Sequence, residues 1–558
     1  MSLTTAQVAS LSTSSVVALS SDQFAVLLST QIAALNTADV RALTTTQVMS
    51  LNSDQIPNLS TAGIAALQTT QLAVLNSDQI IALTTAQAAG LTTATFGALN
   101  TAQVAAMDTA DIGALKTANI ATLTSTNLAA LNTAQIAALS TAQVQSLTTA
   151  NVALLSTDNI VALESADVGA LTSTQIVALK SSQIMVLGSD QVGALSTAAI
   201  AALKTSQLAV LNTDQVIALT STQVMGLTSS TLGALNSAQV AAIETGDIAA
   251  LKSSQIATLA TSTVSALTTD QVIALTSTQL RALSTANMVA LSTEQIVAIE
   301  TADIATLLTS QVAALETADV AALTSDQVMV LTSSELGALK TTQVRALTTD
   351  QVIALTSTQV GTLSTATFAA LTSAQVGALE TGDIANLTST QLKALTSANI
   401  VGLTTEHIVT LTTAQLIQLS TTQVVGLTTE QVAALETGDI VALLTAQVAA
   451  LNTASVAALT SDQVMVLTSS ELAALKTTQI QALTTDQVIA LTTEQVGKLT
   501  TAAVAALTTD QVIAIDTADI GVLTTAHIAA LKSSQLAVLT TDQVIALTTE
   551  QIRGLTST

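Results

Sequence analysis

The amino-acid sequence is an eight-residue repeat that continues without insertion or deletion from Leu3 to Leu555. When Leu3 is taken as position 1, this position recurs 70 times and is Leu in 66 of them. The other residues at position 1 are Met107, Ile243, Ile299 and Ile515. Linkers between separate domains would break such a register, and repeats of this regularity stack on their neighbours. We therefore expect a single continuous octapeptide-repeat solenoid over residues 1–558, with no separate domains.

Apolar side chains occupy fixed places in the octad. Position 6 is usually Val or Ile, and Phe24, Phe96 and Phe368 all fall there, while position 8 is mostly Ala. The pattern predicts that these two positions and the Leu of position 1 form the buried set. Position 3 is Ser or Thr in all 70 octads. Position 7, which takes Met, Ile, Gly and all four Arg residues, is expected to be half-exposed.

A longer period overlies the octad. The segment that begins at Ser325 returns almost unchanged from Ser461, 136 residues or 17 octads later. Acidic residues keep this interval, as in the series Asp108, Glu244, Glu380 and Asp516. Block duplication explains the interval, and the alternative is a superhelical repeat or a lateral contact every 17 octads.

Each octad contains the signals of a helix start. In the sequence TTDQVIAL, the Thr of position 2 would be the N-cap and the Gln of position 5 the third helical residue, which together form a capping box. The Leu of position 1 and the Val of position 6 would complete a hydrophobic staple. All 37 acidic residues lie at positions 2, 4 or 5, where a helix dipole favours negative charge. We predict an all-α solenoid of very short helices, one per octad. Pro57, the sole proline, lacks a backbone N–H and is expected to distort its own octad.

Two questions stay open at this stage. Thr and Val favour strands, so a β-solenoid is the alternative fold, although the adjacent apolar positions 8 and 1 do not alternate as strand residues do. Position 2 is a poor N-cap in the octads with Lys116, Glu436 and Leu444. The hydroxyl of position 3 would then either cap a helix that begins one residue later or bond to the backbone of a neighbouring coil.

The charge balance and the spacing of apolar residues exclude some partners. With 37 acidic and 13 basic residues the net charge is −24. Because binding to phosphate backbones requires Lys and Arg, nucleic acid is a poor partner. Ser and Thr interrupt the apolar residues every few positions, so no apolar run approaches the ~18 residues of a spanning helix. We therefore expect neither nucleic-acid binding nor membrane insertion.

Residues that carry chemistry are few and scattered. Cys is absent, and the two His residues, His407 and His527, lie 15 octads apart at position 5. A metal site needs clustered ligands, so both His residues are interpreted as polar residues of a first helical turn. No Ser or Thr has a neighbouring base that would activate it. We therefore predict no catalytic, cofactor-binding or metal-binding residues, no cofactor and no enzymatic activity, with at most weak calcium association along the acidic rows.

Two resemblances add further expectations. The segment LTTEQVGKL from Leu491 resembles the helix opening LTPEQVVAI of transcription-activator-like effector repeats, which supports a helix start there. Those repeats are much longer and bind DNA, and neither their period nor their charge agrees with this chain. As a whole, the acidic, Thr- and Ala-rich, Cys-free array is similar in composition to the repetitive stalk regions of large secreted bacterial surface proteins. This similarity implies an extracellular or cell-surface location.

The function that these features favour is structural. A regular array without a reactive site is typical of an extended rod, stalk or filament-forming element, whose length is the useful quantity. The alternatives are a ladder of position 3 hydroxyls that binds ice or a glycan, and a solenoid scaffold that binds another protein. Both ends of the chain, MSLTT and GLTST, fall inside the array without the polar capping repeat usual in solenoids. We therefore expect self-association, end to end or laterally, or a longer parent protein.

Overall fold

Short helices joined by tight corners make up the described structure. The computed structural model of the chain describes residues 3–555. Within this range it contains α-helices of four to seven residues, two 3₁₀ turns and no strand, and no helix is long and apolar enough to cross a membrane. Every α-helix begins at position 3, from α1 (Thr5–Ala9) to α67 (Thr549–Leu555), and all except α67 end at position 6, 7 or 8. The predicted all-α solenoid is confirmed, and the β-solenoid alternative is wrong.

The capping box forms with position 2 as the N-cap. At the start of α33 (Thr269–Ile273), the Thr268 N–H donates to Gln271 Oε1 at 2.8 Å. The Gln271 N–H donates in return to Thr268 Oγ1 at 3.2 Å. These two bonds satisfy backbone N–H groups that a helix start otherwise leaves without a partner.

Position 2 remains the N-cap even where its side chain cannot cap. α14 (Thr117–Ala121) and α54 (Thr445–Val448) also begin at position 3, after Lys116 and Leu444, and neither of these side chains makes a capping bond. At α54 the Leu444 N–H still donates to Gln447 Oε1 at 2.8 Å. The position 3 hydroxyl is therefore not the cap, and the bond from the position 2 N–H to Gln survives without a capping side chain.

An extended residue at position 1 turns the chain after a helix. After α6 (Thr45–Ser50), Leu51 has φ −62° and ψ 132°, and its N–H donates to the Val48 carbonyl at 3.3 Å. Helices and corners alternate in this way, so successive octads form the sides of a coil.

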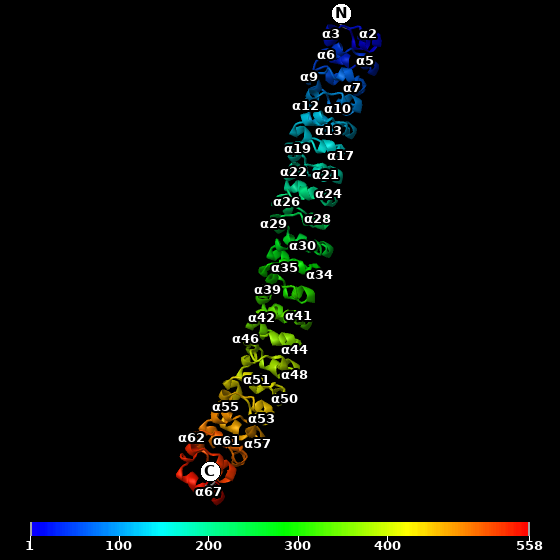
Figure 1. Ribbon diagram of the computed structural model, residues 1–558. Helices are drawn as coiled ribbons and strands as arrows, with labels where there is room; N and C mark the ends of the chain where they lie inside the picture. The colour runs from blue at the N-terminus through cyan, green and yellow to red at the C-terminus, as the bar shows by residue number, and fades with distance from the viewer. Residues whose placement is uncertain (1–2, 556–558) are drawn as a thin grey trace. The chain divides into compact units, whose positions relative to one another are not determined.

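The coils stack so that a helix lies against the helix three octads later. α7 (Thr61–Ala66), α10 (Thr85–Gly90) and α13 (Thr109–Ala114) are packed in this order and follow one another along one side of the stack (Figure 1). Side-chain hydrogen bonds between coils join residues that are 25 to 31 positions apart. One turn of the solenoid therefore takes between three and four octads.

Two compact units divide the chain, an N-terminal unit up to Leu283 and a C-terminal unit from Ser284. The N-terminal unit ends with α34 (Ser277–Ala282), and the C-terminal unit begins with α35 (Thr285–Ala290). Both units are built from the same octad geometry. The octad register continues through the boundary in the sequence, and a single continuous array over residues 1–558 stays a prediction.

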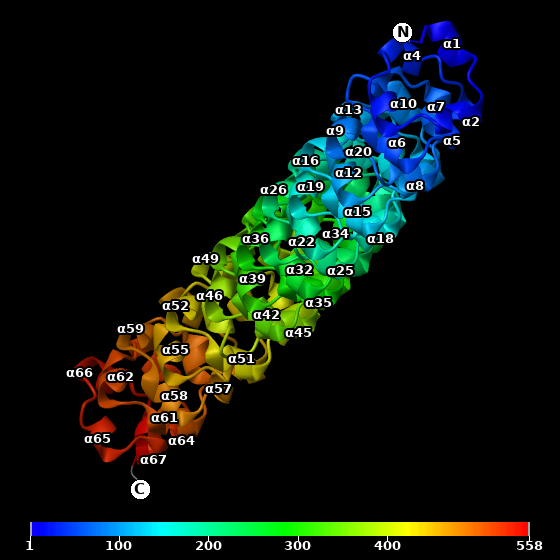
Figure 2. The same cartoon turned by 90° about the horizontal axis from the view of Figure 1, so that it is seen from above.

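The last coil of the C-terminal unit shows how one turn is assembled. It consists of α64 (Thr525–Ala530), α65 (Ser533–Leu536), α66 (Thr541–Ala546) and α67. These helices go round the stack, and α67 packs against α64 (Figure 2). Each helix thus has its main contacts with the coil below or above.

Positions 1 and 6 form the core, as predicted, but the rest of the buried set differs from the prediction. Val48 at position 6 and Leu51 at position 1 are 1% and 3% exposed, and all three Phe residues are buried. Position 8 is wrong as a core position, since its Ala side chains, such as Ala42, are mostly half-buried. Two residues rotate a helix by about 200°, so position 8 faces away from position 6. Position 5, predicted to be polar and outside the core, is buried instead, and Gln47 is 1% exposed.

Two octads form a 3₁₀ turn in place of an α-helix. η1 (Ile56–Asn58) contains Pro57, whose missing N–H accounts for the distortion that the sequence predicts. η2 (Ile400–Gly402) contains no proline. There the backbone of Gly402 passes so close to Ser373 that a Cβ atom would collide with the Ser373 carbonyl oxygen. Either a proline or a close approach between coils therefore accompanies this turn.

Replacement of one core leucine should open the array locally. Leu347 at position 1 is 7% exposed, so Leu347→Asp would place a carboxylate in the apolar core and should cost about 3 kcal/mol or more. Because coils stack on their immediate neighbours, amide hydrogen exchange should accelerate in the adjoining coils and stay unchanged in remote octads. Ile353→Asp is the control, because Ile353 lies in the same octad and is 49% exposed. Loss of protection throughout the C-terminal unit would contradict this expectation.

Candidate functional site: the position 5 ladder and the outer rows

The side chain of position 5 joins a helix start to the coil below it. Gln79, at the start of α9 (Ser77–Ile81), accepts the Asn76 N–H on Oε1 at 2.9 Å. Its Nε2 donates to the carbonyls of Val48 at 2.8 Å and Leu51 at 2.7 Å, which are 31 and 28 residues earlier. These two carbonyls lie near the C-terminal end of α6 and in the corner after it. One side chain therefore satisfies backbone groups at the start of one helix and at the end of another.

This bridge recurs in both units and is buried. Gln103 and Gln215 in the N-terminal unit and Gln351 and Gln511 in the C-terminal unit make the same three bonds. None of the four is more than 2% exposed. A helix of about five residues leaves most of its backbone groups without intrahelical partners, and a buried group left unpaired is costly. We call the row of buried position 5 side chains in each unit the position 5 ladder.

The two His residues take the place of Gln in the position 5 ladder. The Thr404 N–H donates to His407 Nδ1 at 3.2 Å, and His407 Nε2 lies 2.9 Å from the Leu379 carbonyl, 28 residues earlier. Because Nδ1 accepts, the neutral tautomer with its proton on Nε2 makes both bonds. His527 accepts the Thr524 N–H in the same way, at 3.2 Å. Both His residues lie in a first helical turn, as the sequence predicts, and they also face the coil below.

Burial keeps both imidazoles neutral. It lowers the pKa of His407, although the bond to the Leu379 carbonyl and the charge of Glu406 act in the opposite direction. Burial also lowers the pKa of His527, against the raising effect of the Leu499 carbonyl. A protonated ring would carry a proton on Nδ1 and could no longer accept the N–H of position 2.

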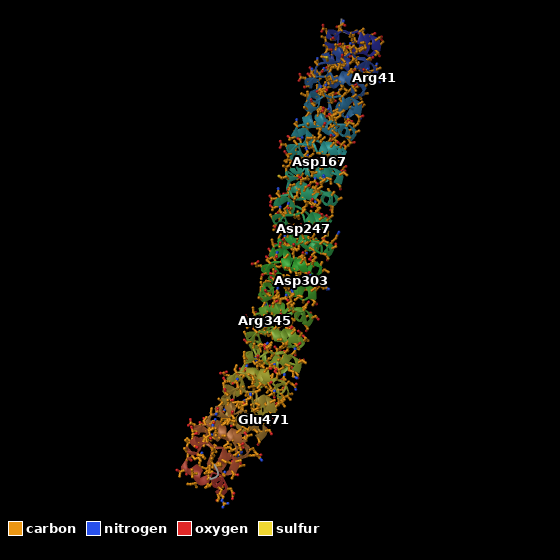
Figure 3. The ribbon with its side chains drawn as sticks, viewed as in Figure 1. Arg41, Asp167, Asp247, Asp303, Arg345 and Glu471 are labelled. Carbon is orange, nitrogen blue, oxygen red and sulfur yellow. The ribbon has the colours of Figure 1, made fainter. Side chains whose placement is uncertain are left out.

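Eleven octads have a carboxylate at position 5 in place of the amide. All eleven side chains are buried, and they belong to Asp39, Asp111, Asp167, Asp247, Asp303, Asp319, Glu335, Asp383, Asp439, Glu471 and Asp519. A carboxylate cannot donate to the carbonyls of the corner below. It accepts instead from the position 3 hydroxyl of that coil, as Asp167 Oδ1 does from Thr141 at 2.8 Å. Figure 3 labels Asp167 and Asp247 along the stack of the N-terminal unit.

Positions 2 and 5 are coupled in a way that the reading of single positions missed. Eight octads have an acidic residue at position 2, and in all eight position 5 is Asp. The pairs are Asp108–Asp111, Glu164–Asp167, Glu244–Asp247, Glu300–Asp303, Glu316–Asp319, Glu380–Asp383, Glu436–Asp439 and Asp516–Asp519. In the sequence, only Asp39 stands at position 5 without an acid at position 2. Comparison of two positions within each octad would have found this signal. We call these residues the acid pairs.

The invariant hydroxyl of position 3 lies near the surface and reaches the coil above. Ser173 Oγ donates to the Ala198 carbonyl at 3.1 Å, 25 residues later. Thr413 Oγ1 donates to Asp439 Oδ1 at 3.0 Å, 26 residues later. Of the two roles that the sequence left open, the bond to a neighbouring coil is therefore correct.

Position 7 forms an outer row with apolar members. Val441, Met465, Ile489 and Ile513 are 24 residues apart and are between 45% and 58% exposed. Their helices pack against one another in this order. The four side chains therefore form a continuous strip on the C-terminal unit, which we call the apolar stripe.

The described residues contain no conventional metal-ligand cluster or polar pocket in the core. No three His, Asp or Glu side chains gather into a group that could hold a metal ion within residues 3–555. A cavity in the core of the N-terminal unit is lined by apolar side chains such as Leu232 and Ile248, together with Thr263, and by no ionisable group. The sequence predictions that the chain has no catalytic, cofactor-binding or metal-binding residues stay predictions.

A known family of repeats matches most of the chain. The sequence profile of the ALTTAQ repeat matches sixteen overlapping segments. Together these segments cover residues 24–69, 91–157, 160–221, 240–365, 376–501 and 512–549. No curated protein matches the chain.

Removal of one amide from the position 5 ladder should weaken the bond between two coils. Gln479 Oε1 accepts the Lys476 N–H at 2.7 Å, and Nε2 donates to the Leu451 carbonyl at 2.6 Å. Gln479→Ala leaves both backbone groups unpaired, so it should destabilise this coil by about 1–3 kcal/mol. Faster hydrogen exchange of the Lys476 amide would report the loss. Gln481→Ala, at an exposed position of the same helix, is the matched control. Equal exchange in the two variants would refute the role of the ladder.

Acid should weaken the coil that contains His407. The pKa of folded His407 lies below its ordinary value of 6.5, so the unfolded chain binds a proton first as the pH falls. The stability contributed by the neutral imidazole is therefore present above about pH 6.5 and is lost as the pH falls through the lowered folded pKa. Local hydrogen exchange, corrected for its intrinsic pH dependence, should rise over this window in the native chain. His407→Gln should remove the rise, and a rise of equal size in that variant would exclude His407 as its cause.

Proposed function

Because the chain belongs to the family of ALTTAQ repeat proteins, we propose that it works as a structural repeat scaffold, an extended and non-enzymatic rod or stalk at a cell surface. The observation that carries the proposal is the stacking pattern, in which a helix packs against helices three octads away. A molecule stabilised by contacts between neighbouring coils gains length, and not a new core, with each added octad.

The growth of the array supports the same proposal. The 136-residue block keeps the octad register, so duplication of a block adds 17 octads without disturbing the coils on either side. Selection for length would favour such duplications, because each copy brings its own helix starts and its own position 5 ladder. An enzyme would need one site that differs from the repeat, and the buried polar side chains described here serve stacking.

The proposed location rests on composition. The chain has a net charge of −24 and no Cys, and it is similar in composition to the stalk regions of secreted bacterial surface proteins. High net charge of one sign keeps a long protein soluble and separates neighbouring molecules. The absence of Cys removes thiols that would oxidise outside a cell.

A protein-binding scaffold is the second candidate, and the apolar stripe favours it. Exposed apolar side chains in a continuous row are typical of an interaction surface, and lateral self-association would use the same row. The ice- or glycan-binding alternative is less well supported. Part of its hydroxyl ladder, including Ser173 and Thr413, already donates to the coil above.

The length hypothesis is testable with an in-register deletion. Removal of residues 325–460 joins Thr324 to Ser461 with the octad unbroken. The shortened chain should fold, and its contour length in rotary-shadowed electron micrographs should decrease by about a quarter. Removal of residues 325–456, which breaks the register, is the control and should disrupt the coils at the junction. Compact particles, or an unchanged length after the in-register deletion, would refute the rod.

A further inference from the structure

Four acid pairs recur once in each 136-residue block. Each has an acid at the N-cap and an Asp at position 5, and the pairs are Asp108–Asp111, Glu244–Asp247, Glu380–Asp383 and Asp516–Asp519. The helices that they begin are α13, α30 (Thr245–Ala250), α47 (Thr381–Ala385) and α63 (Thr517–Val522). Two negative charges in one octad, one of them buried, oppose folding unless something neutralises them.

The side chains of positions 2 and 5 converge on one corner of the coil below. In the octad of α8 (Thr69–Leu72), Gln68 Nε2 and Gln71 Nε2 both donate to the Arg41 carbonyl, at 3.4 and 3.2 Å. In an acid pair, carboxylates stand at both of these positions. Burial raises the pKa of Asp111, and the charge of Asp108 raises it further, so the two carboxylates are within electrostatic reach of each other. The Asp516–Asp519 pair behaves in the same way.

The buried Asp has oxygen atoms that nothing in the described chain satisfies. Ser221 Oγ donates to Asp247 Oδ1 at 2.6 Å, but Asp247 Oδ2 is buried without a hydrogen-bond partner. Asp111 Oδ2 and both carboxylate oxygens of Asp383 are in the same state. These three Asp side chains are only 2% to 4% exposed. A buried charged oxygen without a partner is among the costliest features that a fold can contain.

Each corner also offers backbone oxygen. In an ordinary octad the Gln amide donates to the carbonyl 28 residues earlier, as Gln79 does to Leu51. The corresponding carbonyls below the four pairs belong to Leu83, Leu219, Leu355 and Leu491. Asp has no amide group to donate to them. Two carboxylates and a carbonyl therefore surround one place between two coils, and all of them are acceptors.

We propose that each of these four corners binds one calcium ion between two coils. The ligands are the carboxylate of position 2, the Asp of position 5 and the Leu carbonyl 28 residues before that Asp, and water completes the shell. Calcium takes carboxylate and carbonyl oxygens in flexible geometry, whereas magnesium demands a near-ideal octahedron. The two positive charges of calcium balance the two carboxylates, which a singly charged ion cannot do. The ion thus replaces the Gln amide as the bridge between coils, and this inference does not depend on the proposed cell-surface role.

Octads outside this series explain why we limit the proposal to four corners. Asp39 follows Asn36, so it has no acidic partner, and both of its carboxylate oxygens are satisfied, by Thr13 Oγ1 at 3.1 Å and by the Asn36 N–H at 3.3 Å. Both oxygens of Asp319 likewise accept hydrogen bonds. Such side chains are accommodated without an ion.

Two matched sets of four substitutions test the proposal. The first set is Asp111→Asn, Asp247→Asn, Asp383→Asn and Asp519→Asn. Asn is already used at position 5, where Asn127 Nδ2 donates to the Leu99 carbonyl at 2.9 Å, so this variant should fold. The control set is Asp78→Asn, Asp214→Asn, Asp350→Asn and Asp486→Asn, at exposed position 4 with the same interval of 136 residues. Both sets remove the same charge by the same chemical change.

Isothermal titration of the full-length protein with calcium chloride, with magnesium chloride for comparison, gives the readout. The native chain and the control variant should bind about four calcium ions per chain saturably, and calcium should raise their melting temperatures. The position 5 variant should lose both the saturable binding and the calcium-dependent shift in melting temperature. Calcium binding that survives in the position 5 variant would place the ions on the outer surface and overturn the proposal. Absence of saturable binding to the native chain, with the buried Asp residues protonated instead, would overturn it equally.

Discussion

The buried side chain of position 5 is the interaction on which the stacking of such short helices depends. A helix of four to seven residues has few internal hydrogen bonds, and its core contribution is one Leu and one Val or Ile. Most of its backbone polar groups would be lost to water if the coils did not supply partners. The amide of Gln79 accepts at the start of its own helix and donates near the end of another helix in the coil below. It thereby makes secondary structure and coil stacking two consequences of one residue.

The replacements at this position follow the same chemistry. His407 keeps one acceptor and one donor, and its lowered pKa reflects the need for a neutral ring. Asn127 keeps the donor to the corner. Asp247 gives up the donor, recruits the hydroxyl of Ser221 and leaves one buried oxygen without a partner. The ladder therefore tolerates changes that preserve its hydrogen bonds, and it becomes a candidate ion site where an acid pair removes the donor.

Much of the local structure followed from the octad. The capping box of Thr268 and Gln271, the all-α fold and the burial of Phe24, Phe96 and Phe368 were all predictable, because each depends on residues within one octad. The burial of Gln47 was not predictable from polarity, since its partners in the coil below are 28 to 31 residues away. Position 8 was misplaced because Ala42 is apolar, although helix geometry turns it away from the core. The acid pairs were visible in the sequence, but only the three-dimensional convergence of positions 2 and 5 gives them chemical meaning.

The sequence by itself determined where each helix begins, which residues cap it and that the chain must be an array, because capping and periodicity act over fewer than eight residues. The tertiary structure decided that a turn takes between three and four octads, that position 5 faces the interior and that the position 3 hydroxyl reaches the coil above. These properties depend on which carbonyl comes within hydrogen-bonding distance of which side chain after one turn. That separation is set by the corners and the packing of whole coils, and no single octad contains it.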